Sequence, residues 1–417
     1  MSRDEPGASG RAAPHAAAPG LPMSEPPLPQ APIGRMIALL ALAAFASASA
    51  FRICDPLLPQ LAQEFGTTTG QAAHAVTIFA VAYGLLQFFF GPIGDRYGKF
   101  RTVATATVLC AVGSAGVALA PTLDLLLLCR FLSGAAGAGI VPLSMAWIGD
   151  NVPYEQRQIT LARFLTGTIS GMAAGQVLGG VFAGTLGWRW AFAFLAAGYL
   201  CTGLLLLRGA RRLPREASAA VLSSAGGFFA PTVSVLRVPW ARKVLLVTFL
   251  EGALVFGVLA FVPAYMQQRY GLSPTAAGLL AGAYALGGFA YVLVARRLVP
   301  ALGEKGLAGA GGAMLSAAFL AYWLAGGWMW LAAAGLMAGF GYYLLHSTLQ
   351  ANATQMAPKV RGTAVALFAS FLFIGQSAGV AAAGLVVDGV GMHWLLLAGA
   401  LSCPLLAAGF VFALGRR

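Results

Sequence analysis

The sequence predicts an all-α membrane protein in which twelve transmembrane helices form two six-helix bundles. Three observations support this fold class. Of the 417 residues, 59% are hydrophobic and only 9% are charged, whereas soluble domains use about 25% charged residues. Apolar stretches of about 20 residues, the length that crosses a bilayer, recur along the chain. The second half also repeats residue positions of the first half, as in membrane proteins with duplicated bundles.

Each apolar stretch is expected to form one membrane-spanning helix. The first six helices are expected over residues 36–57, 74–93, 102–121, 124–147, 160–185 and 190–208. The second six are expected over residues 243–266, 273–297, 306–325, 327–352, 362–387 and 392–414.

These spans divide the chain into four segments. Residues 1–35 are rich in Pro, Ala and Gly and lack apolar periodicity, so we expect a disordered cytoplasmic tail. Residues 36–208 are expected to form the first bundle, and residues 243–417 the second. The longest polar gap, 209–242, is rich in arginine and is expected to be a basic cytoplasmic linker.

The two halves repeat at a spacing of 204 residues. The pairs at this spacing are Pro59 and Pro263, Arg157 and Arg361, Ala162 and Ala366, Phe164 and Phe368, Gly171 and Gly375, Gly175 and Gly379, Gly180 and Gly384, Gly187 and Gly391, and Trp190 and Trp394. One more residue of offset pairs Gly66 with Gly271 and Gly98 with Gly303. Self-similarity of this period predicts two homologous bundles related by an axis along the membrane normal, with a substrate site between them.

The basic residues indicate how the chain lies in the membrane. The net charge is +13, but these residues are spread over short loops, so we expect no nucleic-acid partner. With a cytoplasmic N-terminus, nearly all Lys and Arg fall on the inner side, as the positive-inside rule requires. We therefore expect a multi-pass protein of a bacterial-type inner membrane with both termini in the cytoplasm.

The sequence carries no pattern typical of an enzyme or a metal site. The five cysteines lie in apolar stretches without a C-x-x-C pair, which favours ordinary packing. The motif H-E-x-x-H and a Walker-type phosphate loop are also missing. We expect no cofactor, and an ion gradient rather than ATP as the energy source for transport.

A short charged hairpin, GPIGDRYGKFR, separates the second and third apolar stretches. It resembles the loop G-x-x-x-D-R-x-G-[RK] of the major facilitator superfamily, and the resemblance extends over about residues 36–414. The residues that match are Gly91, Asp95, Arg96, Gly98 and Lys99. The resemblance implies a conformational latch here, in which Asp95, Arg101 and Asp150 form a charge cluster and Asp95 caps the eleventh helix.

Two ionisable residues of the first half are candidates for proton coupling. Arg130, in RFLSG, resembles the coupling arginine of the superfamily, and an intramembrane arginine needs a partner such as Asp55. The alternative is that Arg130 extends to the outer membrane surface. Asp55 begins a D-x-x-x-P pattern that resembles drug exporters of the superfamily. The alternative for Asp55 is a local pair with Arg52 at the membrane surface.

The expected fifth helix carries glycines at every fourth position. It resembles the antiporter motif G-x3-G-P-x-x-G-G, but Gln176 stands where the motif has proline. The matching glycines are Gly167, Gly171, Gly175, Gly179 and Gly180. Small residues at this spacing let helices approach closely, and we expect contact with a helix of the opposite half. The missing proline weakens the inference of antiport.

Three further sets of residues are candidates for function. Glu251 lies well inside the seventh helix, which makes it a second candidate for proton coupling; the alternative is an interfacial pair with Lys243 or Arg242. A substrate wall is expected from Tyr83 and Gln87 in the second helix. A matching wall is expected in the tenth helix from Tyr342, His346 and Gln350, although a lone histidine there also fits plain packing.

The resemblance implies a secondary active transporter that works by alternating access. We expect proton-coupled efflux of a small amphipathic or drug-like compound by a monomer in the lipid bilayer. The alternatives are uptake of a small organic solute by proton symport, or a receptor of the same fold that does not transport.

Overall fold

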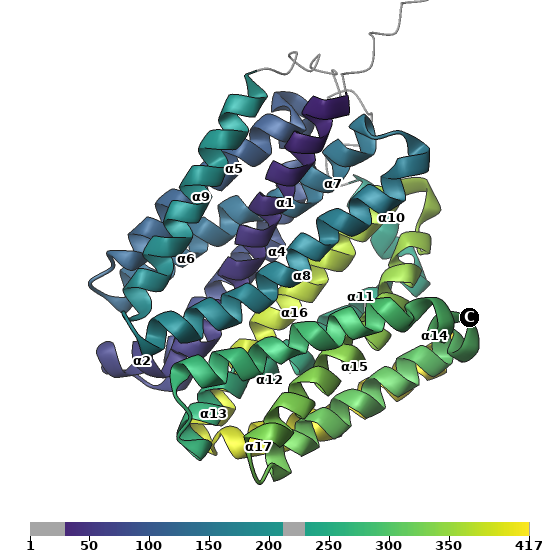
Figure 1. Ribbon diagram of the computed structural model, residues 1–417. Helices are drawn as coiled ribbons and strands as arrows, with labels where there is room; N and C mark the ends of the chain where they lie inside the picture. Colours follow the sequence, from purple (N-terminus) through teal and green to yellow (C-terminus); the bar gives the residue numbers. More distant parts are fainter. Residues whose placement is uncertain (1–29, 212–229, 417) are drawn as a thin grey trace, which may run out of the picture.

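Long apolar stretches of the chain form helices joined by short turns. The computed structural model describes residues 30–211 and 230–416, and these residues contain no strand (Figure 1). The first half consists of α1 (Gln30–Arg52), the 3-10 turn η1 (Asp55–Leu57), α2 (Leu58–Glu64), α3 (Thr69–Ala72), α4 (His74–Tyr97), α5 (Lys99–Ala118), α6 (Leu123–Gly137), α7 (Ile140–Asn151), α8 (Tyr154–Gly184) and α9 (Trp188–Ala210).

The second half also consists of long helices with short helices and turns between some of them. It consists of α10 (Ala230–Arg237), α11 (Pro239–Glu251), the π-helical turn η2 (Gly252–Phe256), α12 (Gly257–Leu259), α13 (Val262–Tyr270), α14 (Pro274–Leu324), α15 (Trp328–Gln355), the 3-10 turn η3 (Pro358–Val360), α16 (Arg361–Gly389) and α17 (Met392–Gly415).

The predicted fold class is confirmed. Among the described residues, ten helical stretches are long and apolar enough to cross a membrane. One of them, α14, contains two of the expected spans, because its backbone is non-helical at Gly303 (φ 62°). The remaining expected span, 160–185, corresponds to α8, which is 31 residues long.

The tail and the linker differ from the prediction at their borders. α1 begins at Gln30, so residues 30–35 of the predicted disordered tail are helical. Pro32 lies in the first turn of α1, where its missing N–H costs no helical hydrogen bond. Residues 1–29 and 212–229 lie outside the described part of the chain. Within the predicted linker 209–242, α10 and the first turn of α11 are helical.

The first transmembrane segment is longer than predicted and is interrupted. α1 ends at Arg52, and the chain continues through η1 and α2 to Glu64. The interruption precedes Pro56, which has no N–H for a helical hydrogen bond. As a result, Asp55 lies on a short 3-10 turn in the middle of a membrane segment.

The predicted repeat is visible in the backbone. The glycines with positive φ form three pairs, which are Gly66 and Gly271, Gly98 and Gly303, and Gly187 and Gly391. Each pair has the spacing expected from the sequence. The close helix contacts repeat as well, because Gly171 packs on the Phe45 carbonyl and Gly375 packs on the Phe249 carbonyl. The two halves therefore share one architecture.

The two bundles meet along two pairs of helices. α8 of the first bundle packs on α14 of the second, and α4 packs on α16 (Figure 1). We call the end of the bundles that holds α2 and α13 the outer end, following the predicted orientation. The opposite end, with the turns at Gly98 and Gly303, is the inner end.

Candidate functional site

Asp55 lies in a buried polar cluster next to the interface of the bundles. Its carboxylate Oδ2 is 3.0 Å from Arg52 Nη1 and accepts a hydrogen bond of 2.8 Å from Gln176 Nε2. Arg52 is 2% exposed and Asp55 is fully buried. Of the two alternatives for Asp55, the local pair with Arg52 is present. This pair lies inside the protein and not at its surface, because the interruption of α1 turns both side chains inward.

Gln176 stands where the antiporter motif has proline, and it binds Asp55, the candidate proton carrier. It lies on α8 and is 6% exposed. From the sequence, we noted only that proline is absent at this position. An amide can donate to a carboxylate, which proline cannot do. The departure from the motif therefore supplies a contact to Asp55.

The expected contact of this helix with the opposite half is present on α14, but most of its motif glycines pack within their own bundle. Gly167, Gly171, Gly175 and Gly179 face the backbone of α1 or the residue that follows it. Only Gly180 of this set packs on the opposite half, on α14. Gly180 differs because it lies on a neighbouring face of α8. The other four glycines are spaced four residues apart and therefore lie on one face.

Replacing Gly175 by valine is expected to lower the melting temperature in detergent by several degrees. A Cβ at Gly175 would lie 3.0 Å from the Ser49 Cα, and overpacking of this kind costs about 1–3 kcal/mol. The matched control is Gly198→Val in α9, where nothing lies within 4 Å of the added Cβ. Equal melting temperatures for the two variants would contradict the packing role.

Arg130 neither pairs with Asp55 nor extends to the surface, which corrects both expectations. Its Nε donates to the Ala75 carbonyl (3.0 Å) and its Nη1 donates to the Ala50 carbonyl (3.1 Å). Its guanidinium also lies 4.0 Å from the centre of the Phe79 ring. Ala50 belongs to the last turn of α1, where carbonyls lack donors from their own helix. Arg130 therefore joins α1, α4 and α6.

Glu251 forms a second buried polar site in the second bundle. Its carboxylate Oε2 is 2.9 Å from His346 Nδ1 on α15, and Glu251 itself is fully buried. The pair replaces the expected alternative of an interfacial contact with Lys243 or Arg242. Glu251 is followed directly by the π-helical turn η2, a local distortion that is frequent at functional sites.

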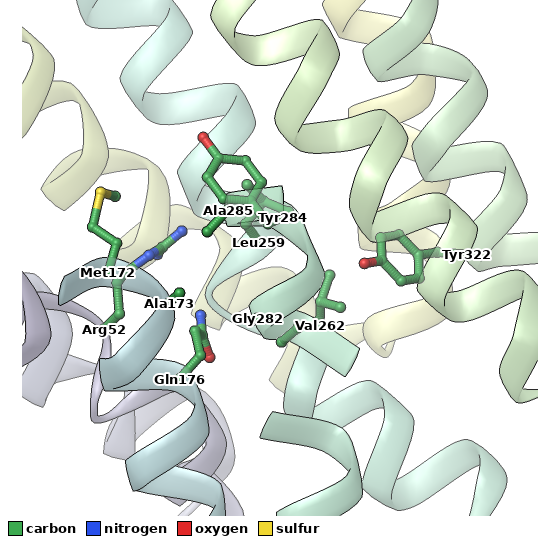
Figure 2. Close-up of a pocket in the computed structure, with 11 residues that line it drawn as sticks. Arg52, Met172, Ala173, Gln176, Leu259, Val262, Gly282, Tyr284, Ala285 and Tyr322 are labelled. Atoms are coloured by element: carbon green, nitrogen blue, oxygen red, sulfur yellow. The ribbon is translucent and has the colours of Figure 1, made fainter. Parts of the chain in front are cut away.

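A small cavity lies between the two bundles, next to the polar site of Asp55. The first bundle contributes Arg52, Met172 and Gln176, and the second contributes Val262, Tyr284 and Tyr322, among others. Figure 2 places these two groups on opposite sides of the cavity. The cavity has room for about one or two water molecules. The Arg52 guanidinium also lies 4.9 Å from the centre of the Phe256 ring, so it contacts both bundles.

The expected substrate wall is only partly assembled. Tyr83 packs on Phe373 (ring centres 4.7 Å apart) and Gln87 donates to the Ala366 carbonyl (3.5 Å), so both face α16. Tyr342 stacks on His346 at 4.8 Å, beside Glu251, whereas Gln350 is exposed.

Tyr284 and Tyr322 line the cavity, although sequence reasoning passed over both. Each lies inside an expected helix, 273–297 or 306–325, in which most other residues are apolar or small. The phenolic hydroxyl of a tyrosine within such a helix was the one sequence feature that could have identified them.

The charge cluster at the inner end is centred on Lys99. Lys99 Nζ lies 2.5 Å from Asp150 Oδ2 and 3.7 Å from Asp95 Oδ1. The prediction placed Arg101 in this role, but Lys99 follows the turn at Gly98 directly and is therefore the nearer cation. Gly91 and Arg96 lie on α4 next to this cluster. The role of the cluster as a latch stays a prediction.

Hydrogen bonds join the bundles at their outer end. Asp388 of α16 accepts from the Thr68 hydroxyl (2.6 Å) and from the Gly70 N–H (3.0 Å). Gln267 of α13 donates to the Pro56 carbonyl (3.0 Å). Ser377 of α16 donates to the Thr77 carbonyl, also at 3.0 Å. The outer end is therefore closed.

Two homologous helical bundles around a buried charged site define a membrane transport protein rather than an enzyme. The family model described as Major Facilitator Superfamily matches residues 40–380 and 244–417. The chain belongs to the major facilitator superfamily.

Several known proteins are similar to parts of the chain. The uncharacterized MFS-type transporter YwfA of Bacillus subtilis is 26% identical over 267 residues, which is 64% of each chain. The efflux pump radE of Floropilus chiversii is 28% identical over 64% of this chain and 54% of its own. The multidrug export protein EmrB of Haemophilus influenzae is 27% identical over 40% of this chain and 33% of its own. The chain thus spans less than two thirds of each of these relatives.

A solved structure shares the fold over nearly the whole chain. It is a bacterial homolog to the human lysosomal transporter Spinster in an inward-facing and occupied conformation. The TM-score is 0.75 at 17% identity, covering 92% of this chain and 97% of that chain. The unoccupied form gives a TM-score of 0.71.

Proposed function

We propose that the protein exports a small amphipathic or drug-like compound by proton-coupled alternating access. The observation that carries this proposal is the position of Asp55, a buried carboxylate beside the cavity between the bundles. A carboxylate there can change its charge as the cavity opens to one side or the other. Glu251 is the other buried carboxylate among the described residues, and it is the competing site.

The contacts at the two ends support alternating access. Hydrogen bonds that Asp388 accepts and that Gln267 donates close the outer end. The ion pairs of Lys99 at the inner end are with Asp95 and Asp150 of its own bundle. Motion of one bundle against the other would therefore break the contacts at the outer end while keeping these ion pairs intact.

The names of the relatives support export. radE is named an efflux pump and EmrB a multidrug export protein. The membrane placement proposed with this function is a bacterial inner membrane with both termini in the cytoplasm, which follows from the distribution of basic residues.

Uptake by proton symport is a second candidate, and the ion pair of Asp55 favours it. A cationic drug that competed with the proton for Asp55 would have to displace Arg52, which lies 3.0 Å from the same carboxylate oxygen. A solute that binds together with the proton meets no such obstacle.

Purified protein in liposomes tests the proposal. A panel of amphipathic compounds is added across an imposed proton gradient, with a pH-sensitive dye inside the liposomes. Export by antiport predicts that the protons and the compound move in opposite directions, and symport predicts the same direction. Binding without any gradient-dependent flux would identify a receptor and reject both candidates.

A further inference from the structure

The buried charges of the first bundle do not balance. Arg52, Arg130 and Asp55 are its buried charged residues among those described. Two cations and one carboxylate leave a net charge of +1 when Asp55 is ionised and of +2 when it is protonated. Glu251 in the second bundle is bound to His346 instead. The first bundle therefore buries an excess positive charge, and burying an unpaired ion is costly. Of its two buried cations, Arg52 is the one that lines the cavity.

Polar atoms without hydrogen-bond partners border the same cavity. Arg52 Nη1 makes an ion pair with Asp55 but no hydrogen bond. The Gln176 Oε1 and the Tyr284 hydroxyl also have no hydrogen-bond partner. All three residues are buried and line the cavity (Figure 2). Buried polar atoms are normally satisfied, so these atoms point to a polar ligand.

We propose that this cavity binds a small organic anion, of the carboxylate class, through the guanidinium of Arg52. A guanidinium matches the geometry of a carboxylate and can bind it through two parallel hydrogen bonds. The Tyr284 hydroxyl can donate a third hydrogen bond. The anion takes the place of Asp55 as the partner of Arg52 when Asp55 accepts a proton.

The remaining wall of the cavity fits the apolar part of such an anion. Met172, Leu259 and Val262 line it, together with the small residues Gly282 and Ala285, which leave room. The present cavity is too small for an aromatic acid, so the ligand binds when the bundles have moved apart. Pockets of this kind fix a ligand by a few polar groups on an apolar wall.

Proton and anion binding are thereby coupled. A protonated Asp55 no longer neutralises Arg52, and an anion restores the balance, so each ligand strengthens the binding of the other. The titratable and charged groups around the pair are Cys54, Arg130, Tyr284 and Tyr342. Glu251 lies beside the two tyrosines. This inference rests on the proton coupling proposed above, and it assigns symport to anionic substrates.

Three compounds of nearly the same shape test the proposal: benzoate, benzamide and benzamidine, which are an anion, a neutral amide and a cation. Binding to the purified full chain is measured by calorimetry at several pH values, with proton exchange followed by a pH-sensitive dye. Benzoate is expected to bind with uptake of a proton, and its affinity falls by up to about tenfold per pH unit as the pH rises. Benzamide and benzamidine are expected to bind at least about tenfold more weakly.

Two variants make the outcome decisive. Asp55→Asn leaves Arg52 without a counter-ion, so benzoate binds more tightly and independently of pH, without proton uptake. Arg52→Gln loses benzoate binding, and Arg52→Lys retains it in weakened form, which separates loss of charge from misfolding. Failure of Asp55→Asn to bind benzoate would overturn the anion site. Binding of benzamidine with release of a proton would also overturn the anion site, but it would agree with the proposed proton-coupled export.

Discussion

Proton-driven transport is expected to fall to the background of protein-free liposomes when Asp55 is replaced by asparagine. Asparagine keeps the shape of the side chain and can still contact Gln176, but it cannot gain or lose a proton. Exchange of labelled for unlabelled substrate across the membrane needs no change of protonation and is expected to persist. The measurement is flux in proteoliposomes with and without a proton gradient, using a substrate found in the panel.

Two variants serve as controls for this result. Asp124→Asn removes an exposed carboxylate at the start of α6 and is expected to leave coupled flux unchanged. Glu251→Gln removes the competing carboxylate and is expected to change substrate affinity more than coupling. Intact coupled flux in Asp55→Asn, together with loss in Glu251→Gln, would move the proton site to the second bundle.

Replacing Gly180 by valine is expected to open the outer end of the protein. A Cβ at Gly180 would lie 2.9 Å from the Gly278 Cα on α14 of the other bundle. Overpacking costs about 1–3 kcal/mol, and here the cost applies only while the outer end is closed. We expect a shift of about five- to a hundredfold toward the outward-open state.

A cysteine at Ser377 reports this shift. Ser377 is buried and donates to the Thr77 carbonyl across the two bundles. In a background without the native cysteines, its labelling by a membrane-impermeant maleimide from outside is expected to accelerate in Gly180→Val. The control Gly389→Val lies at the outer end of α16 with nothing within 4 Å of the added Cβ. Equal labelling rates in both variants would reject the closed state described here.

The fold could be predicted because membrane helices follow from local composition. Each span needs only an apolar stretch of sufficient length, and the repeat at 204 residues appears again as paired turns such as Gly187 and Gly391. The end of the first transmembrane segment was harder to predict. Pro56 indicates an interruption, but the continuation to Glu64 depends on packing in α2 that no local signal specifies.

The sequence could identify the charged residues of the candidate site, but not the groups that each of them binds. Asp55, Arg130 and Glu251 stand out because charges inside a membrane are costly. Their partners depend on the relative rotation of helices, which the sequence does not reveal. Arg130 therefore binds two backbone carbonyls instead of Asp55. Gln176, which looked like a lost motif residue, turned out to bind Asp55.

The absence of proline from α8 has a mechanical consequence. The helix runs for 31 residues from Tyr154 to Gly184 without an internal proline, so no missing N–H interrupts its hydrogen bonds. It contacts Asp55 through Gln176 in its middle part and α14 through Gly180 near its outer end. α8 can therefore act as one continuous lever, in which a small tilt at the charged site displaces both ends of the helix.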